Sequence, residues 1–115
     1  MSAGRYDIVI EQGAGFRLAI TWKDSEGKPV NLTGYTAKAQ VRASHKASAA
    51  LLTFTTADAS IVLGGAAGTI VLEADHEATE ALARGGVWDL KLTPPGKEPV
   101  RLLEGRAALK EASTK

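Results

Sequence analysis

Hydrophobic and polar residues alternate over several short stretches of the chain. Four large apolar side chains in the clearest stretch, 16–23, occupy every second position: Phe16, Leu18, Ile20 and Trp22. A period of two residues places alternate side chains on opposite faces of a β-strand, so this stretch predicts a strand with one buried face. Comparable patterns predict further strands at 6–10, 35–42, 51–56, 61–63, 69–73, 87–93 and 100–109.

Glycine, proline and polar residues separate these stretches about every ten residues. Gly27 and Gly34 are predicted turn positions, and Pro29, which cannot donate to a strand ladder, belongs at an edge. Gly105 lies inside the last predicted strand and is a candidate β-bulge. Seven or eight short strands at this spacing are typical of an all-β sandwich or barrel.

A single segment, 74–84, has a helical pattern. Asp75 is a candidate N-cap, and Glu77 lies in the first turn, where the helix dipole favours an acidic residue. Gly85 is a natural residue to follow the last turn. We therefore expect one short helix that lies between strands and does not form the core.

The inward-facing positions of the strands predict one hydrophobic core and one domain over 6–109. Residues 1–5 and 110–115 are small or polar and are expected to form a flexible lead-in and a flexible tail. The predicted core consists of Phe16, Leu18, Ile20, Trp22, Leu32, Tyr35, Val41, Phe54, Ile70, Leu72, Trp88, Leu90 and Leu92.

Composition excludes several classes of function. The chain has 115 residues, a net charge of +1 and no cysteine. Without cysteine, neither a disulfide framework nor a thiolate metal site can form. A charge near zero gives no general surface for phosphate, so we expect no nucleic-acid partner. No apolar run approaches the roughly 18 residues of a membrane span, so we expect no membrane partner.

Candidate catalytic and metal-binding residues are few. The two histidines are His45, in a polar loop, and His76, between Asp75 and Glu77. Zinc sites usually need three or four converging ligands, and hydrolysis by a serine nucleophile needs a tight elbow and a nearby base. The sequence supplies neither arrangement, so it predicts no enzyme, no metal and no cofactor.

Two parts of the sequence resemble a known group of proteins. The segments 6–13 and 16–24 look like the opening of small tailed-phage virion proteins. The run Gly27-Lys28-Pro29-Val30-Asn31-Leu32-Thr33-Gly34-Tyr35-Thr36-Ala37, which leads into a basic alternating strand, is similar to the N-terminal domain of phage baseplate upper proteins. With the strand spacing, this resemblance leads us to expect an immunoglobulin-like antiparallel β-sandwich of seven or eight short strands with one short helix.

The resemblance implies a non-enzymatic structural protein of a tailed bacteriophage virion. We expect an adaptor in the tail, baseplate or fibre-attachment region, made and assembled in the bacterial host cytoplasm. Its expected partners are other virion structural proteins in a multi-copy symmetric assembly. One alternative is a head decoration protein, which cements the capsid. Another is a carbohydrate-binding module that contacts the host surface.

The polar loop 44–50 is the candidate interface within the domain. The candidate interface residues in it are Ser44, His45 and Lys46. The two ends of the chain are further candidates, because flexible ends often become ordered on docking. A carbohydrate-binding module would need exposed aromatic side chains, whereas Trp22 and Trp88 lie on the apolar faces of their predicted strands.

Overall fold

The computed structural model describes residues 4–111 of the chain. Strands dominate this part of the molecule, with one short α-helix and one 3-10 turn. In chain order the elements are β1 (Gly4–Arg5), β2 (Ile8–Glu11), β3 (Phe16–Thr21), β4 (Thr36–Arg42), β5 (Leu52–Thr55), β6 (Ile61–Leu63), η1 (Gly65–Ala67), β7 (Thr69–Ala74), α1 (His76–Glu80), β8 (Gly86–Thr93) and β9 (Val100–Lys110).

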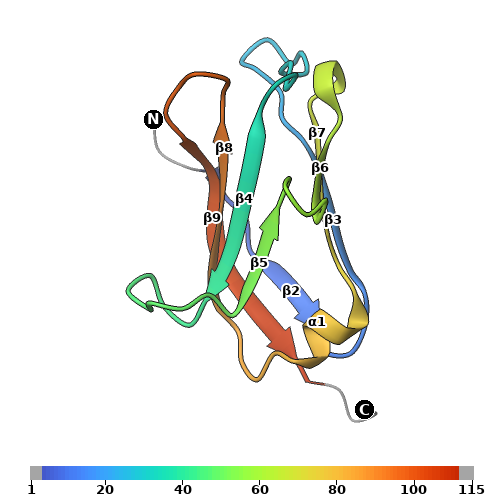
Figure 1. Cartoon of the computed structure of the whole chain (residues 1–115), viewed down its shortest axis with the longest axis vertical. Helices are drawn as coiled ribbons and strands as arrows, with labels where there is room; N and C mark the ends of the chain where they lie inside the picture. Colours follow the sequence, from blue (N-terminus) through green and yellow to red (C-terminus); the bar gives the residue numbers. More distant parts are fainter. Residues whose placement is uncertain (1–3, 112–115) are drawn as a thin grey trace.

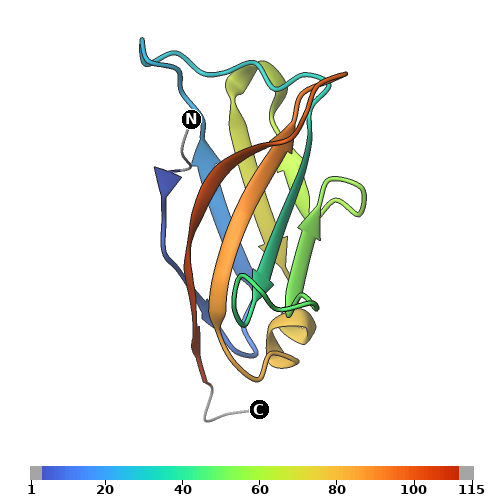
Figure 2. The same ribbon diagram turned by 90° about the vertical axis from the view of Figure 1, so that its left-hand side faces the viewer.

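The strands form two sheets that pack face to face (Figures 1 and 2). The larger, sheet A, has six strands in the order β1-β9-β8-β4-β5, and β2 also pairs with β9. The smaller, sheet B, has the order β3-β7-β6. Neighbouring strands are antiparallel, except that β1 and β2 run parallel to β9. The predicted β-sandwich with one short helix is confirmed.

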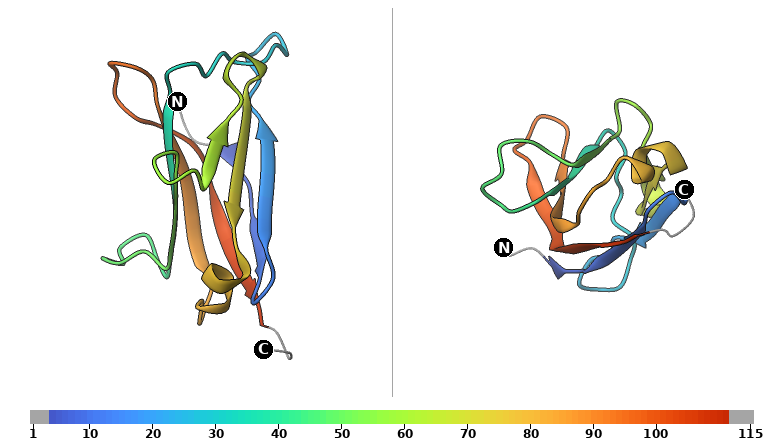
Figure 3. Two further views of the ribbon diagram at one scale, coloured as in Figure 1. Left: turned by 45° about the vertical axis from the view of Figure 1, so that its right-hand side comes forward. Right: turned by 90° about the horizontal axis from the view of Figure 1, so that it is seen from below.

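The strand order is that of an immunoglobulin-like domain. In that fold, strands B, E and D share one sheet, while G, F, C and C′ share the other. Here β3-β7-β6 follow the first order and β9-β8-β4-β5 follow the second, with β1 and β2 added at the β9 edge. Seen from below in Figure 3, the two sheets lie opposite each other. The immunoglobulin-like topology therefore follows from the pairing itself.

The core lies between the sheets, and the predicted core residues divide into two groups. Those that are at most 2% exposed are Leu32, Val41, Phe54, Ile70, Leu72, Trp88, Leu90 and Leu92. Those that pack against this core but are only partly buried are Phe16, Leu18, Ile20, Trp22 and Tyr35. Most of the second group lies on β3 or next to it. Among the strands of residues 4–111, β3 pairs with β7 alone, so this sheet edge stays open to solvent. Trp22, expected to be buried, is therefore only partly so.

The run that resembles phage proteins carries the chain from sheet B to sheet A. The Val30 N–H donates to the Trp22 carbonyl (2.9 Å), and the Leu32 N–H donates to the Gly65 carbonyl (2.9 Å). These bonds hold the crossing segment against the end of sheet B. The Leu32 side chain is 1% exposed and closes the core at this end of the sandwich.

The turn residues of the same run have the backbone that their types suggest. Gly27 and Gly34 have φ values of +80° and +82°, in the left-handed region that side chains disfavour. A Cβ at Gly34 would also lie 3.2 Å from Cγ of Pro95. Pro29 forms an isolated bridge with Lys23 at the end of β3, outside the regular ladders. Each residue therefore acts in the turn or at the edge of the sheet.

The helix is shorter than its pattern predicts. It spans His76–Glu80, whereas the prediction covered 74–84. Ala74, the first residue of the predicted helix, still belongs to β7, because it pairs with Phe16 on β3. Asp75 caps the helix as expected, since its carboxylate accepts the Ala78 N–H at 2.8 Å. The helices in the described part of the chain are too short and too polar to cross a membrane.

Strand pairing also corrects the predicted ends of the domain. Gly4–Arg5, placed in the flexible lead-in 1–5, form β1 and pair with β9. Lys110, placed in the flexible tail 110–115, is the last residue of β9 and pairs with Glu11. Both segments gain partners that are distant in sequence, which local composition does not reveal. Residues 1–3 and 112–115 lie outside the described residues.

Gly105 is not the bulge that the sequence suggested. The β8–β9 register shifts after Leu90, which pairs with Leu103, because Lys91 pairs with Arg101 and leaves Leu102 as the extra residue. Gly105 instead marks a close approach of two backbones. A Cβ there would lie 2.2 Å from the carbonyl oxygen of Tyr6, so only glycine fits without movement.

Candidate interaction surface

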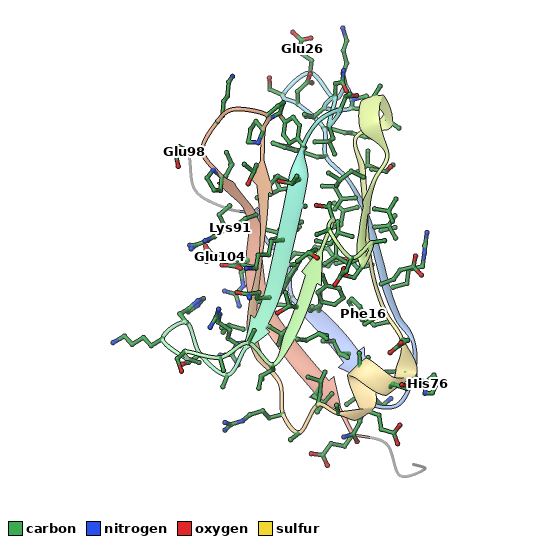
Figure 4. The ribbon with its side chains drawn as sticks, viewed as in Figure 1. Phe16, Glu26, His76, Lys91, Glu98 and Glu104 are labelled. Atoms are coloured by element: carbon green, nitrogen blue, oxygen red, sulfur yellow. The ribbon has the colours of Figure 1, made fainter. Side chains whose placement is uncertain are left out.

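The outer face of sheet A gathers most of the charge that the strands present. Because side chains alternate along each strand, the residues opposite the buried ones on β4, β8 and β9 all point outward. The charged residues among them are Lys38, Arg42, Asp89, Lys91, Arg101, Glu104, Arg106 and Lys110. Six of these residues are cations and two are carboxylates, so the outward positions of β4, β8 and β9 have an excess of four positive charges. Figure 4 shows Lys91 and Glu104 pointing away from the sandwich.

The strand register arranges these charges in three bands that run across the strands. Lys38, Lys91 and Arg101 are successive cross-strand partners and form the cationic row. Asp89 and Glu104 are partners in the next outward row, and on the far side of Glu104 this row continues to Arg5 of β1. The third band contains Arg42 and Arg106 on either side of Val87. Over β4, β8 and β9, the outer face of sheet A therefore has a positive, a negative and a positive band in succession along the strands.

The cationic row places like charges directly opposite each other, which does not favour the free domain. Adjacent strands lie about 4.8 Å apart, so two exposed charges at that spacing repel by roughly 0.9 kcal/mol in water before salt screening. On the outer face of sheet B the chain instead pairs opposite charges, since Arg17 lies opposite Glu73. Like charges directly opposite destabilise a sheet. The two outer faces therefore differ in how the strand register places their charges.

One ion pair joins the cationic row to the neighbouring band of Asp89 and Glu104. The Arg101 Nε lies 3.4 Å from the Asp89 Oδ2, with side chains that are 49% and 29% exposed. A pair this exposed stabilises a protein by about 0–1 kcal/mol. It holds the Arg101 guanidinium over the face while leaving much of it accessible.

The predicted interface loop borders this face. Arg42 donates from Nη1 to the Ala47 carbonyl and from Nη2 to Gln40 Oε1, both at 2.7 Å, and so fastens the loop to β4. Ser44, His45 and Lys46 are all exposed. A groove of about 300 Å³ extends over the face, lined by His45 together with β4, β8 and β9 side chains such as Lys38, Gln40, Asp89 and Lys91.

Sequence reasoning found the loop but missed the charged face beside it. The residues that the sequence did not assign to an interface are Lys38, Asp89, Lys91, Arg101, Glu104 and Arg106, although Arg101 and Arg106 stand out in it as a basic cluster with Lys110. Their signal was present, because charged residues occupy the polar positions of the alternating stretches at 35–42, 87–93 and 100–109. What the sequence alone does not show is which strands are neighbours and in which register, and that information creates the bands.

The described residues bring no catalytic or metal-binding set together. His45 borders the outer face of sheet A, whereas His76 begins α1, beside sheet B (Figure 4). Within residues 4–111, no group of three histidine, aspartate or glutamate residues could hold a metal ion. Hydrogen bonds from Ser60, first from its hydroxyl and then from its N–H, lower the pKa of the Asp58 carboxyl. That carboxyl orders the exposed turn between β5 and β6.

The comparisons with known proteins concern the fold. No protein-family model and no curated protein matches the sequence. Solved structures with a similar fold include extracellular domains 3–5 of Drosophila OTK, at 17% identity and a TM-score of 0.40 over 90% of this chain. This chain spans 32% of that OTK chain. A chain from a study of multimeric cell-adhesive interactions of VGSC beta subunits has 14% identity and a TM-score of 0.43, covering 96% of both chains.

A third similar structure is Tim-1, with 13% identity and a TM-score of 0.41, covering 100% of this chain and 99% of that one. Likeness at these identities is one of architecture only. The class of the protein therefore rests on its own strand order, which defines an immunoglobulin-like β-sandwich with a charged outer face on its larger sheet.

Proposed function

We propose that the chain is a non-enzymatic structural protein of a tailed-phage particle, which acts as an adaptor in the tail, baseplate or fibre-attachment region. It joins other virion proteins through protein–protein contacts in a multi-copy symmetric assembly. In this proposal the protein is made and assembled in the cytoplasm of the bacterial host. The sandwich provides a rigid body, and its exposed sheet face provides the contact.

The run 27–42 is the observation that carries this proposal. It resembles the N-terminal domain of phage baseplate upper proteins. In the structure its first half makes the crossing between the sheets, where Leu32 closes the core. Its second half is β4, which brings Lys38 and Arg42 to the outer face of sheet A. The segment that resembles phage proteins thus builds both the sandwich and part of the candidate interaction surface.

The position of Trp88 argues against a sugar-stacking site there. Its side chain is 2% exposed, and its indole N–H donates to the Tyr6 carbonyl at 2.7 Å. A stacking platform needs an exposed aromatic face. The outward positions of β4, β8 and β9 carry charged, polar and aliphatic side chains instead.

Quantitative mass spectrometry of purified particles of the encoding phage tests the proposal. An adaptor should be present at tens of copies or fewer, in a fixed ratio to tail proteins. A count in the hundreds would instead identify a head decoration protein. If the protein is made in infected cells but is missing from purified particles, the virion proposal is wrong.

A further inference from the structure

The charge bands on the outer face of sheet A specify the chemistry of a partner. We propose that this face docks an extended segment of another protein whose side chains on one side run acidic, basic, acidic at alternate positions. This inference rests on the proposed function, because it names the partner of the same adaptor surface. The bands and their register, described above, carry the argument.

Spacing supports an extended partner that lies along the strands. Successive bands on this face are two residues apart on β4 and β8, as Lys91 and Asp89 are, which corresponds to about 7 Å. On β9 the extra residue Leu102 makes Arg101 and Glu104 three residues apart. Side chains on one side of an extended segment repeat at the same spacing. One partner acid then meets the cationic row, the base meets Asp89 and Glu104, and the second acid meets Arg42 and Arg106.

The same bands argue against two other occupants. A second copy docked face to face in register, about a two-fold axis through the middle band, would place positive bands on positive bands and the Asp89–Glu104 band on itself. A nucleic-acid backbone would set its phosphates against Asp89 and Glu104, and the whole chain carries a net charge of only +1. An alternating protein segment is the occupant that satisfies all three bands.

Short synthetic peptides provide the first test, with binding to the full-length protein followed by backbone amide NMR shifts. The probe alternates threonine with charged residues in the order glutamate, lysine, glutamate. Its control has the same composition in the order glutamate, glutamate, lysine. We expect the probe to shift amides of β4, β8 and β9 and to bind about fivefold more tightly than the control. Equal binding by both peptides, or shifts confined to other strands, would overturn the proposal.

Two matched double variants separate the cationic row from net charge. Lys38→Gln with Lys91→Gln removes two charges from the row. Arg17→Gln with Lys23→Gln removes two exposed charges from β3 and the residues just beyond its end, outside sheet A. We expect the first pair to weaken probe binding about fivefold without lowering the urea midpoint, and the second to leave binding unchanged. Equal losses in both pairs would show a net-charge effect only and would sink the proposal.

Two further measurements address the excluded occupants and the proposed function. If an oligothymidylate binds more tightly than the probe, a nucleic acid replaces the proposed occupant. If the free protein dimerises and the Lys38→Gln, Lys91→Gln variant does not, a second copy of the chain replaces it. Normal incorporation of that variant into particles, with no probe binding, would reject this inference and leave the virion role standing. Probe binding by a protein that particles lack would instead reject the virion role alone.

Discussion

The close contact between Gly105 and Tyr6 gives the sharpest test of how the N-terminal strands are held. We expect Gly105→Ala to destabilise the protein. An alanine inside a strand normally stabilises it by about 0.5–1 kcal/mol relative to glycine. Here the added Cβ would lie 2.2 Å from the Tyr6 carbonyl oxygen and 2.7 Å from Asp7 Oδ1. The predicted effect therefore has the opposite sign from the usual one.

The magnitude follows from the hydrogen bonds at this crossing. Displacing residues 6–7 weakens three of them: Tyr6 N–H to the Glu104 carbonyl (2.9 Å), Trp88 Nε1–H to the Tyr6 carbonyl (2.7 Å) and Arg106 N–H to Asp7 Oδ1 (2.9 Å). Each contributes about 1 kcal/mol. We expect a loss of about 2–3 kcal/mol, which lowers the urea midpoint by roughly 1–2 M for a protein of this size.

Urea denaturation followed by circular dichroism measures this loss. Gly15→Ala is the matched control, because the nearest heavy atom to its added Cβ lies 3.9 Å away. Its midpoint should stay close to that of the unmodified protein. Trp88→Phe removes one of the same hydrogen bonds. The double variant Trp88→Phe, Gly105→Ala should therefore lose less stability than the sum of the losses of the two single variants. An unchanged or raised midpoint for Gly105→Ala would refute the argument.

Other predictions concern single positions. Ala59 has a φ of +65°, which costs an alanine about 1–2 kcal/mol, so Ala59→Gly should raise the free energy of unfolding by about 0.5–1 kcal/mol in urea titrations; a loss would contradict this. Leu32 is 1% exposed, and Leu32→Ala should cost about 2–5 kcal/mol by the same assay, a value below 1 kcal/mol counting against its place in the core. The lowered pKa of Asp58 means that its contribution to stability is present above about pH 4 and is lost as the pH falls through its folded value. In an Asp58→Asn variant the free energy of unfolding should therefore fall less steeply as the pH is lowered below about 4. An unchanged slope would show that the hydrogen bonds of Asp58 contribute nothing to stability. Trp88 is 2% exposed, so acrylamide should quench the fluorescence of a Trp22→Phe variant only weakly, and strong quenching would contradict its burial.

Much of the fold could be predicted from the sequence because alternation is a local signal. The stretch 61–63 and the inward positions of 87–93 lie where the pattern places them. Asp75 caps the helix because its side chain acts on a neighbouring turn. Where the structure differs, the competing interaction comes from far along the chain. Ala74 joins β7, which shortens the helix, since it pairs with Phe16.

The candidate surface could be predicted only in part, for the same reason. The loop around His45 stands out by its composition alone. The cationic row depends on the pairing of Lys38 with Lys91 and of Lys91 with Arg101, which includes the register shift at Leu102. That shift is what brings Arg101 opposite Lys91. A one-residue change of register would turn the outward charges of a strand toward the core, so pairing and burial are determined together.

The parallel pairing of the first and last strands has a mechanical consequence. β1 and β2 descend beside β9 in the same direction, as Figure 2 shows, and Gly4 lies level with Leu103 while β9 continues to Lys110. Gly4, where β1 begins, and Lys110, where β9 ends, are therefore about 23 Å apart along the strand direction. A force that pulls Gly4 and Lys110 apart slides β2 and β9 past each other. It loads the hydrogen bonds between these two strands at the same time, whereas a force that peels the strands apart would break the bonds one after another. This shear geometry should make the sandwich more resistant to stretching along these strands than an arrangement in which the end strands peel apart.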